Sequence, residues 1–147
     1  MTNDLISTFF EQDHREIDAL LSAVPFETPK DALAKFQEFD CRLERHIGWE
    51  EGILFPAVSA KEACLEPGPI RVMKLEHAEI RREKAAALVA LREGRGAASK
   101  GHVQAMLAVL KGHNMKEEQI LYPACDNLLT PAERAAVFQR LRAGAAA

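Results

Sequence analysis

The chain has 147 residues, 48% of them hydrophobic and 28% charged, and a formal net charge of −3 at pH 7. This length suits one domain with a substantial core, and the interspersed charges form no basic patch of the kind that binds nucleic acid. No apolar run approaches the roughly 18 residues that cross a bilayer, and the N-terminus lacks the basic and apolar regions of a secretory signal. We therefore predict neither a nucleic-acid nor a membrane partner.

Long segments rich in Ala, Leu, Glu, Lys and Arg alternate with short clusters of Gly and Pro, and no stretch has the period of a strand. Apolar residues recur at three-and-four spacing within each long segment. The sequence predicts an all-α single domain over residues 1–147. Helices at roughly 3–24, 30–60, 68–93 and 98–122 should form an up-down-up-down four-helix bundle.

The run Thr130-Pro131-Ala132-Glu133 follows the fourth predicted helix. It combines a capping box with proline at the first helical position, which is a helix-start signal. We expect a short fifth helix over about residues 131–142, followed by a frayed Gly-Ala tail.

One phrase occurs twice: residues 46–57 read HIGWEEGILFPA and residues 113–124 read HNMKEEQILYPA. Each copy is preceded by an isolated acid-His pair, Asp13-His14 and Glu76-His77. The chain is therefore two tandem units, each offering one His followed by a His-x-x-x-Glu pair.

Six polar residues interrupt the predicted apolar stripes. They are His14, His46, Glu50, His77, His113 and Glu117. Burying an unpaired ionisable group costs several kcal/mol, so each interruption needs a partner. Residues four apart share a helix face, so each His-x-x-x-Glu pair can reach a common ion.

A single histidine on an apolar face is more often a hydrogen-bonded core residue than a metal ligand. All six residues together, in a duplicated arrangement, instead favour a site for two metal ions in the bundle core. Two carboxylates for two metals indicate that each glutamate bridges.

At these residues the chain resembles the hemerythrin-like family, the HHE cation-binding domains. The resemblance covers nearly the whole chain, including both E-E-x-I-L-(F/Y)-P phrases and the L-T-P-A-E-R run. It implies two iron ions bridged by an oxo or hydroxo group from solvent. By analogy, His14 and His46 would hold one iron, His77 and His113 the other, and Glu50 and Glu117 both. Manganese or zinc could replace iron in such a donor set.

The chain departs from the oxygen-carrying hemerythrins at two points. Those proteins have His-x-x-x-His on the third helix, whereas the positions four away from His77 are Met73 and Arg81. One imidazole is therefore missing, and a coordination position is more open. They also place the last carboxylate five residues after its histidine, where this chain has Glu118. We favour Glu117, because it mirrors Glu50. Both departures argue against stable, reversible oxygen carriage.

Other residues near the pattern are expected to play smaller roles. Glu51 and Glu118 should be solvated or support the metal ligands. His102 should lie on the surface, and Trp49 should pack in the core rather than wall the site. Tyr122, which matches Phe55 in the repeat, should be an ordinary core aromatic, with a hydrogen bond near the site as the alternative.

Three functions fit the pattern. The first is a non-haem di-iron protein that binds or senses a small ligand: dioxygen, nitric oxide or iron itself. The second is a di-iron enzyme that decomposes peroxide or repairs damaged iron centres, and the third is a bundle that holds zinc or manganese for stability alone. The three cysteines have no CxxC spacing, which is typical of reduced thiols in a cytoplasmic protein.

Overall fold

The computed structural model describes residues 4–146, which are helical and contain no strand. The predicted helix start at residue 3 and the last tail residue, 147, lie outside these residues. The α-helices are α1 (Ile6–Ser22), α2 (Pro29–Trp49), α3 (Phe55–Ser59), α4 (Arg71–Arg92), α5 (Gly96–Lys116), α6 (Tyr122–Leu128) and α7 (Pro131–Ala146). Shorter turns connect them: η1 (Glu50–Leu54), η3 (Glu66–Ile70) and η4 (Glu117–Leu121) are π-helical, and η2 (Ala63–Leu65) is a 3-10 turn. The all-α prediction is confirmed.

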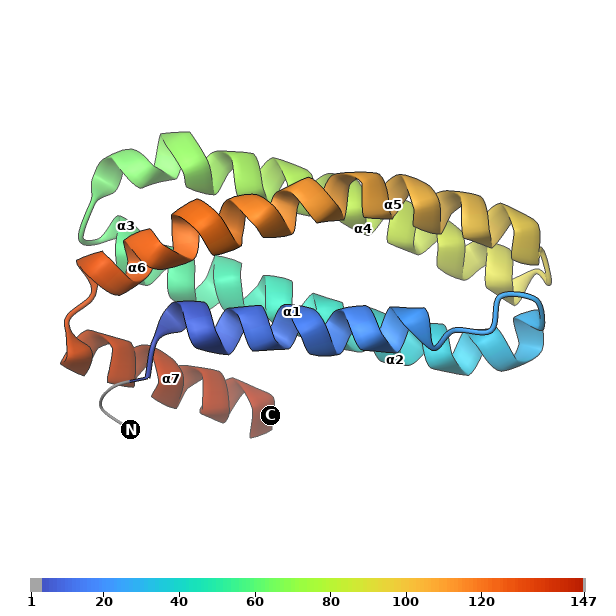
Figure 1. Cartoon of the computed structure of the whole chain (residues 1–147), viewed down its shortest axis with the longest axis horizontal. Helices are drawn as coiled ribbons and strands as arrows, with labels where there is room; N and C mark the ends of the chain where they lie inside the picture. Colours follow the sequence, from blue (N-terminus) through green and yellow to red (C-terminus); the bar gives the residue numbers. More distant parts are fainter. Residues whose placement is uncertain (1–3, 147) are drawn as a thin grey trace.

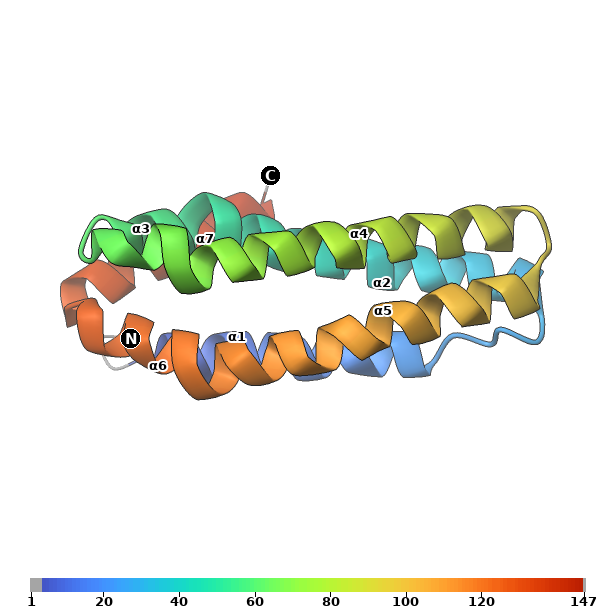
Figure 2. The same ribbon diagram turned by 90° about the horizontal axis from the view of Figure 1, so that it is seen from above.

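The four long helices α1, α2, α4 and α5 lie side by side along the longest axis of the molecule (Figures 1 and 2). The chain reverses direction between consecutive long helices, and α3, α6 and α7 gather at one end (Figure 1). Within the described range, no helix is long and apolar enough to cross a membrane.

Two apolar clusters fill the core. One contains Phe10, Phe55 and Phe138 and lies toward α3, α6 and α7; the other contains Ile17, Phe36 and further residues toward the opposite end. The apolar stripe of α1 contributes to both clusters, and His14 lies between its contributions. The polar residues that interrupt the stripes therefore form a band between two water-excluding layers.

The second and fourth predicted helices continue through a proline by means of a π-helical turn. In η1 the N–H of Phe55, just before Pro56, donates to the carbonyl of Glu50, five residues earlier. In η4 the N–H of Tyr122, just before Pro123, donates in the same way to Glu117. The wider turn gives room for a proline ring that would clash with the carbonyl four residues back in a regular α-helix. The helix predicted to end near residue 122 therefore runs on through α6 to Leu128.

The predicted fifth helix is present as α7, and its capping box is confirmed. Thr130 Oγ1 accepts a hydrogen bond from the N–H of Glu133 at 3.1 Å, and Glu133 Oε1 accepts one from the N–H of Thr130 at 2.8 Å. The helix extends to Ala146 instead of fraying after residue 142. Alanine, the strongest helix former, fills most of this tail.

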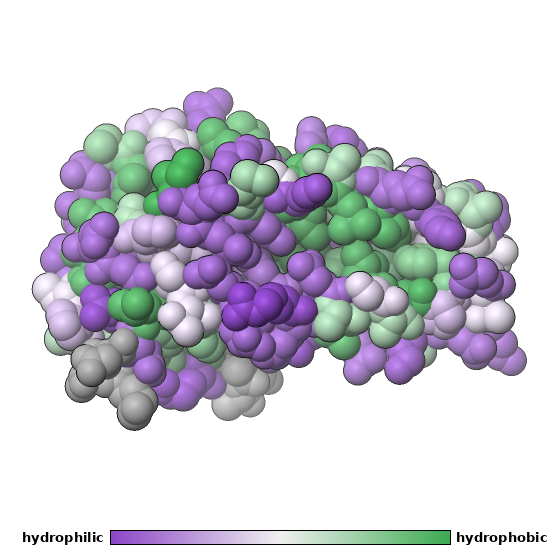
Figure 3. Space-filling view, in the orientation of Figure 1, coloured by the Kyte–Doolittle hydropathy of each residue, from purple (hydrophilic) through white to green (hydrophobic). Residues whose placement is uncertain are grey.

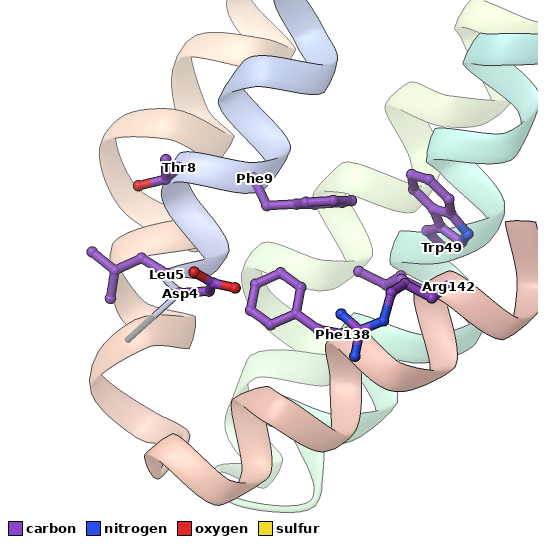
Figure 4. A pocket seen from close by; sticks show the side chains of 8 residues that line it. Asp4, Leu5, Thr8, Phe9, Trp49, Phe138 and Arg142 are labelled. Carbon is purple, nitrogen blue, oxygen red and sulfur yellow. The ribbon is translucent and has the colours of Figure 1, made fainter. Parts of the chain in front are cut away.

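Aromatic residues join α7 to the bundle. Phe9 packs against Trp49 at 5.6 Å and against Phe138 at 5.4 Å between ring centroids. The Arg45 guanidinium lies 4.4 Å from the Trp49 ring centroid. These rings border a pocket of about 600 Å³ between α1, the end of α2 and α7, also lined by Arg142 (Figure 4). Trp49 thus packs between helices, as expected.

Candidate metal centre

All six predicted site residues meet in the band between the apolar clusters. Their side chains are almost fully buried, and Glu50 and Glu117 have no exposed surface. The residues come from six elements: His14 from α1, His46 from α2, Glu50 from η1, His77 from α4, His113 from α5 and Glu117 from η4. Both glutamates are the first residue of a π-helical turn, so the two halves of the repeat present them in the same way.

The six residues form two overlapping groups of four. We call His14, His46, Glu50 and Glu117 site A, and His77, His113, Glu50 and Glu117 site B. In each site, one potential ligand atom per residue lies within 4.8 Å of the others. The structure thus brings together the two ligand sets that the family resemblance implied.

Each glutamate turns one carboxylate oxygen toward each site. Glu50 places Oε2 3.4 Å from His46 Nε2 in site A and Oε1 3.1 Å from His77 Nε2 in site B. Glu117 places Oε1 3.1 Å from His14 Nε2 in site A and Oε2 3.3 Å from His113 Nε2 in site B. A carboxylate in this position can bridge two cations with one oxygen on each.

Every histidine of the centre contacts a second carboxylate through its other ring nitrogen. The Nδ1 atoms pair as follows: His14 with Glu118 at 2.7 Å, His46 with Asp13 at 2.8 Å, His77 with Glu51 at 2.7 Å and His113 with Glu76 at 3.0 Å. Because an ionised carboxylate only accepts hydrogen bonds, each Nδ1 carries the proton and each Nε2 faces the centre. Such outer carboxylates fix the ring orientation and raise the basicity of a metal-binding imidazole.

These contacts explain two features of the sequence. Asp13 and Glu76, the acids of the acid-His pairs, hold the histidine of the following long helix in the same repeat. Glu51 and Glu118, the second glutamates of the repeated phrase, hold a histidine of the other repeat. The expectation that Glu51 and Glu118 support the site is met by these contacts. The role of the acids was missed, although the repeated acid-His pair was its signal.

The network is charged when no metal is bound. Burial opposes charge on His46, but the carboxylate of Glu50 and the hydrogen bond to Asp13 raise its pKa to about 10. Burial also lowers the pKa of His113, but its contact with Glu117 outweighs this effect and raises the pKa to about 9. Burial raises the pKa of Glu50, but the nearby His46 outweighs it and holds that pKa well below its ordinary value. Imidazolium–carboxylate pairs therefore stand where a cation would bind.

Three buried polar atoms of the centre have no hydrogen-bond partner: Glu50 Oε1, Glu117 Oε2 and His77 Nε2. All three belong to site B. A buried polar atom without a partner costs about 1–3 kcal/mol, more if charged, and such atoms often mark a bound ion. Imidazole nitrogens and carboxylate oxygens suit iron, manganese or zinc. The residues present therefore fit a metal pair.

Tyr122 is not the ordinary core aromatic that the sequence favoured; it follows the alternative, a hydrogen bond near the site. Its hydroxyl oxygen lies in site A, 2.5 Å from Glu50 Oε2 and 2.9 Å from Glu117 Oε1. It is also 3.2 Å from His14 Nε2 and 3.3 Å from His46 Nε2. Burial, then the charges of the two glutamates, raise the pKa of Tyr122 well above its ordinary value. The signal in the sequence was a hydroxyl-bearing tyrosine at the position that matches Phe55, within the Ile-Leu-aromatic-Pro-Ala end that both phrases share.

The remaining candidates stay outside the centre. Met73 packs in the apolar core, and Arg81 binds the carboxylate of Glu44, so neither replaces the missing imidazole. His102 is partly exposed and contacts Glu83 at 3.3 Å, as expected for a surface residue.

A small cavity touches all four histidines of the centre. Its volume is about 10 Å³, and its walls include Ile17, Ile80 and Leu110. This is close to the space that one water molecule needs. The centre therefore has space beside the histidine rings for little more than one water-sized group.

Comparison with known proteins gives one match. A family model described as "Hemerythrin HHE cation binding domain" matches residues 5–125. The matched segment includes all the residues of sites A and B. No curated protein and no solved structure matches the chain.

Proposed function

Because the chain belongs to the hemerythrin HHE cation-binding domain family, we propose that it is a non-haem di-iron protein that binds a small ligand, such as dioxygen or nitric oxide. The iron ions would occupy sites A and B, in the core of an up-down-up-down four-helix bundle. His14 and His46 would hold one iron, His77 and His113 the other, and Glu50 and Glu117 would bridge them.

The observation that carries this proposal is the orientation of the two glutamates. Each directs one oxygen to site A and the other to site B. A structural His–Glu network needs only pairwise contacts, and it has no use for the unpartnered oxygens of Glu50 and Glu117 in site B. A second cation would account for those atoms.

When bound, an iron pair would supply electron-transfer and ligand-binding chemistry at positions that water reaches poorly. The chain's own residues would do the rest. Four outer carboxylates keep the Nδ1 protons in place, so each Nε2 lone pair is directed at a metal. The apolar clusters on either side exclude bulk water.

The size and surroundings of the small cavity favour a small, weakly polar ligand. It shares Asp18, Leu110 and Asn114 with an open groove of about 840 Å³ between α1 and α5. Apolar residues gather on the molecular surface between these two helices (Figure 3). A diatomic molecule could pass from this groove to the histidines, whereas a larger substrate would not fit the cavity.

The test is metal analysis of anaerobically prepared protein, with absorption spectra before and after exposure to air. We expect two irons per chain, new near-ultraviolet bands in air, and a nitric oxide adduct of the reduced protein. Peroxide consumption without a stable adduct would favour the enzymatic alternative. One zinc or no metal in a folded protein would refute the proposal, because the six residues would then be a structural network.

We also propose that the protein works in the cytoplasm. All three cysteines are free, with Cys41 and Cys64 exposed and Cys125 buried. Reduced thiols suit the cytoplasm, where thiols are kept reduced.

A further inference from the structure

We propose that Tyr122 is a fifth protein ligand to the metal in site A, so that the two metals are unequal and an external ligand binds at site B. This inference rests on the proposed two-metal function. It concerns a residue that the repeat pattern does not mark as a ligand.

The position of the phenol oxygen carries the argument. Metal bonds to imidazole nitrogen and carboxylate oxygen are roughly 2.1 Å long, so two ligands at right angles around one metal lie roughly 3 Å apart. The Tyr122 oxygen lies 2.5, 2.9, 3.2 and 3.3 Å from the four potential ligand atoms of site A. It is thus spaced from each of them as a fifth ligand would be.

Hydrogen bonding alone does not account for this position. A phenol hydroxyl has one proton to donate. Its donation to Glu50 at 2.5 Å leaves the Glu117 oxygen, 2.9 Å away, facing a second oxygen without a proton between them. Two oxygen atoms at this distance without a proton between them repel one another. A cation surrounded by all four site A atoms and the phenol oxygen removes that conflict.

The two repeats differ at the position of Tyr122, where the first repeat has Phe55. Phe55 occupies the matched place beside site B, where its ring lies nearly parallel to that of His77, with 6.3 Å between centroids. Phe55 offers no ligand atom, and neither Met73 nor Arg81 supplies one. Site B also contains all the unpartnered atoms of the centre. The protein therefore provides five ligands at site A and four at site B.

Coordination would exchange one bond for another. The O–H bond of Tyr122 breaks, its proton leaves to solvent, and an oxygen–metal bond forms without any change of oxidation state. A bound metal cation favours this deprotonation, as it does for other coordinating groups.

The test is the absorption and resonance Raman spectrum of the oxidised, iron-loaded full-length protein. A phenolate bound to iron(III) gives a charge-transfer band in the visible region and enhanced ring vibrations. Tyr122 is the single tyrosine of the chain, so any such signal belongs to it. We expect the signal in the iron-loaded parent protein and its complete loss in iron-loaded Tyr122→Phe, where four protein ligands remain at site A, with the iron content of each sample measured.

A matched variant moves the tyrosine to the other repeat. In Phe55→Tyr combined with Tyr122→Phe, the phenolate signal should return, now from site B. Titration of the reduced proteins with nitric oxide should give one adduct in the parent protein and two in Tyr122→Phe.

The outcomes separate this inference from the proposed function. Two irons per chain without a phenolate signal in the parent protein would overturn the inference and leave the di-iron proposal standing. A signal that persists in Tyr122→Phe would overturn it as well. The parent spectrum decides even if a variant fails to fold. Failure to bind two metals would overturn both.

Discussion

Asp13 is the most buried of the four carboxylates that contact histidine Nδ1 atoms. Its side chain is 7% exposed, against 33% for Glu118, which contacts the other histidine of site A. The Asp13→Asn change keeps the shape but removes the charge 2.8 Å from His46 Nδ1. Loss of such an outer partner typically lowers metal affinity 10- to 100-fold, or about 1.4–2.7 kcal/mol. Because solvent screens Asp13 so little, we expect an effect toward 100-fold at site A.

Glu118→Gln is the matched control, because it changes the same metal through the more exposed contact to His14. We expect a loss of about tenfold or less, since solvent screens the lost charge. Both stepwise affinities would be measured by competition with a chelator, using cobalt(II) or zinc, after circular dichroism has established that each variant is folded. Site B affinity should stay near the parent value in both variants. An Asp13→Asn protein that binds both metals within about twofold of the parent would refute the reasoning, as would a larger loss in Glu118→Gln.

Three further predictions concern the ligands, the protons and the fold. Glu50→Ala should lose both metals because it removes a bridge, whereas His14→Ala should mainly weaken one; equal metal content in both variants and the parent would contradict the assignment. In the metal-free protein, His46 and His113 have pKa values raised to about 10 and about 9, so both are protonated at pH 7 and metal binding must release protons. Metal affinity should therefore rise with pH. The raised pKa values stabilise the metal-free fold fully below pH ~6.5, and this stabilisation is lost as the pH rises through 9 to 10. Calorimetry in buffers of different ionisation enthalpy would detect the released protons, and metal binding without proton release would refute the assignment of these pKa values. Thr130→Ala should cost about 1 kcal/mol and lower Tm by about 2–4 °C through loss of the α7 cap, with metal content unchanged; an unaltered Tm would show that the cap does not stabilise the fold.

The sequence determined the helices and the residues that face the core. Helix periodicity is local, because a side chain's direction depends on its position along its own helix. The same spacing that placed Phe10 and Ile17 on the buried face of α1 also placed His14 there. The capping box of α7 was predictable for the same reason, since its two hydrogen bonds join residues three apart.

The course of the chain past Pro123 was decided by the structure. The sequence shows a proline, which ordinarily ends a helix, but not the π-helical turn before it that lets the helix continue. That turn also sets the direction of Tyr122 relative to Glu117, and a regular α-helical count does not predict it. The sequence therefore favoured an ordinary core aromatic at Tyr122 over a residue of the site.

The contacts between helices were likewise beyond the sequence. The pairing of carboxylates with histidine Nδ1 atoms depends on how far neighbouring helices are shifted along their axes. The side-chain pattern of a single helix does not reveal that shift. Glu118 thus contacts His14, which lies 104 residues earlier in the sequence, and Glu51 contacts His77 in the other repeat. The sequence determined that six ionisable groups would face a common core. Only the packing of the helices directs one carboxylate oxygen of each glutamate to site A and the other to site B, and places the hydroxyl of Tyr122 in site A.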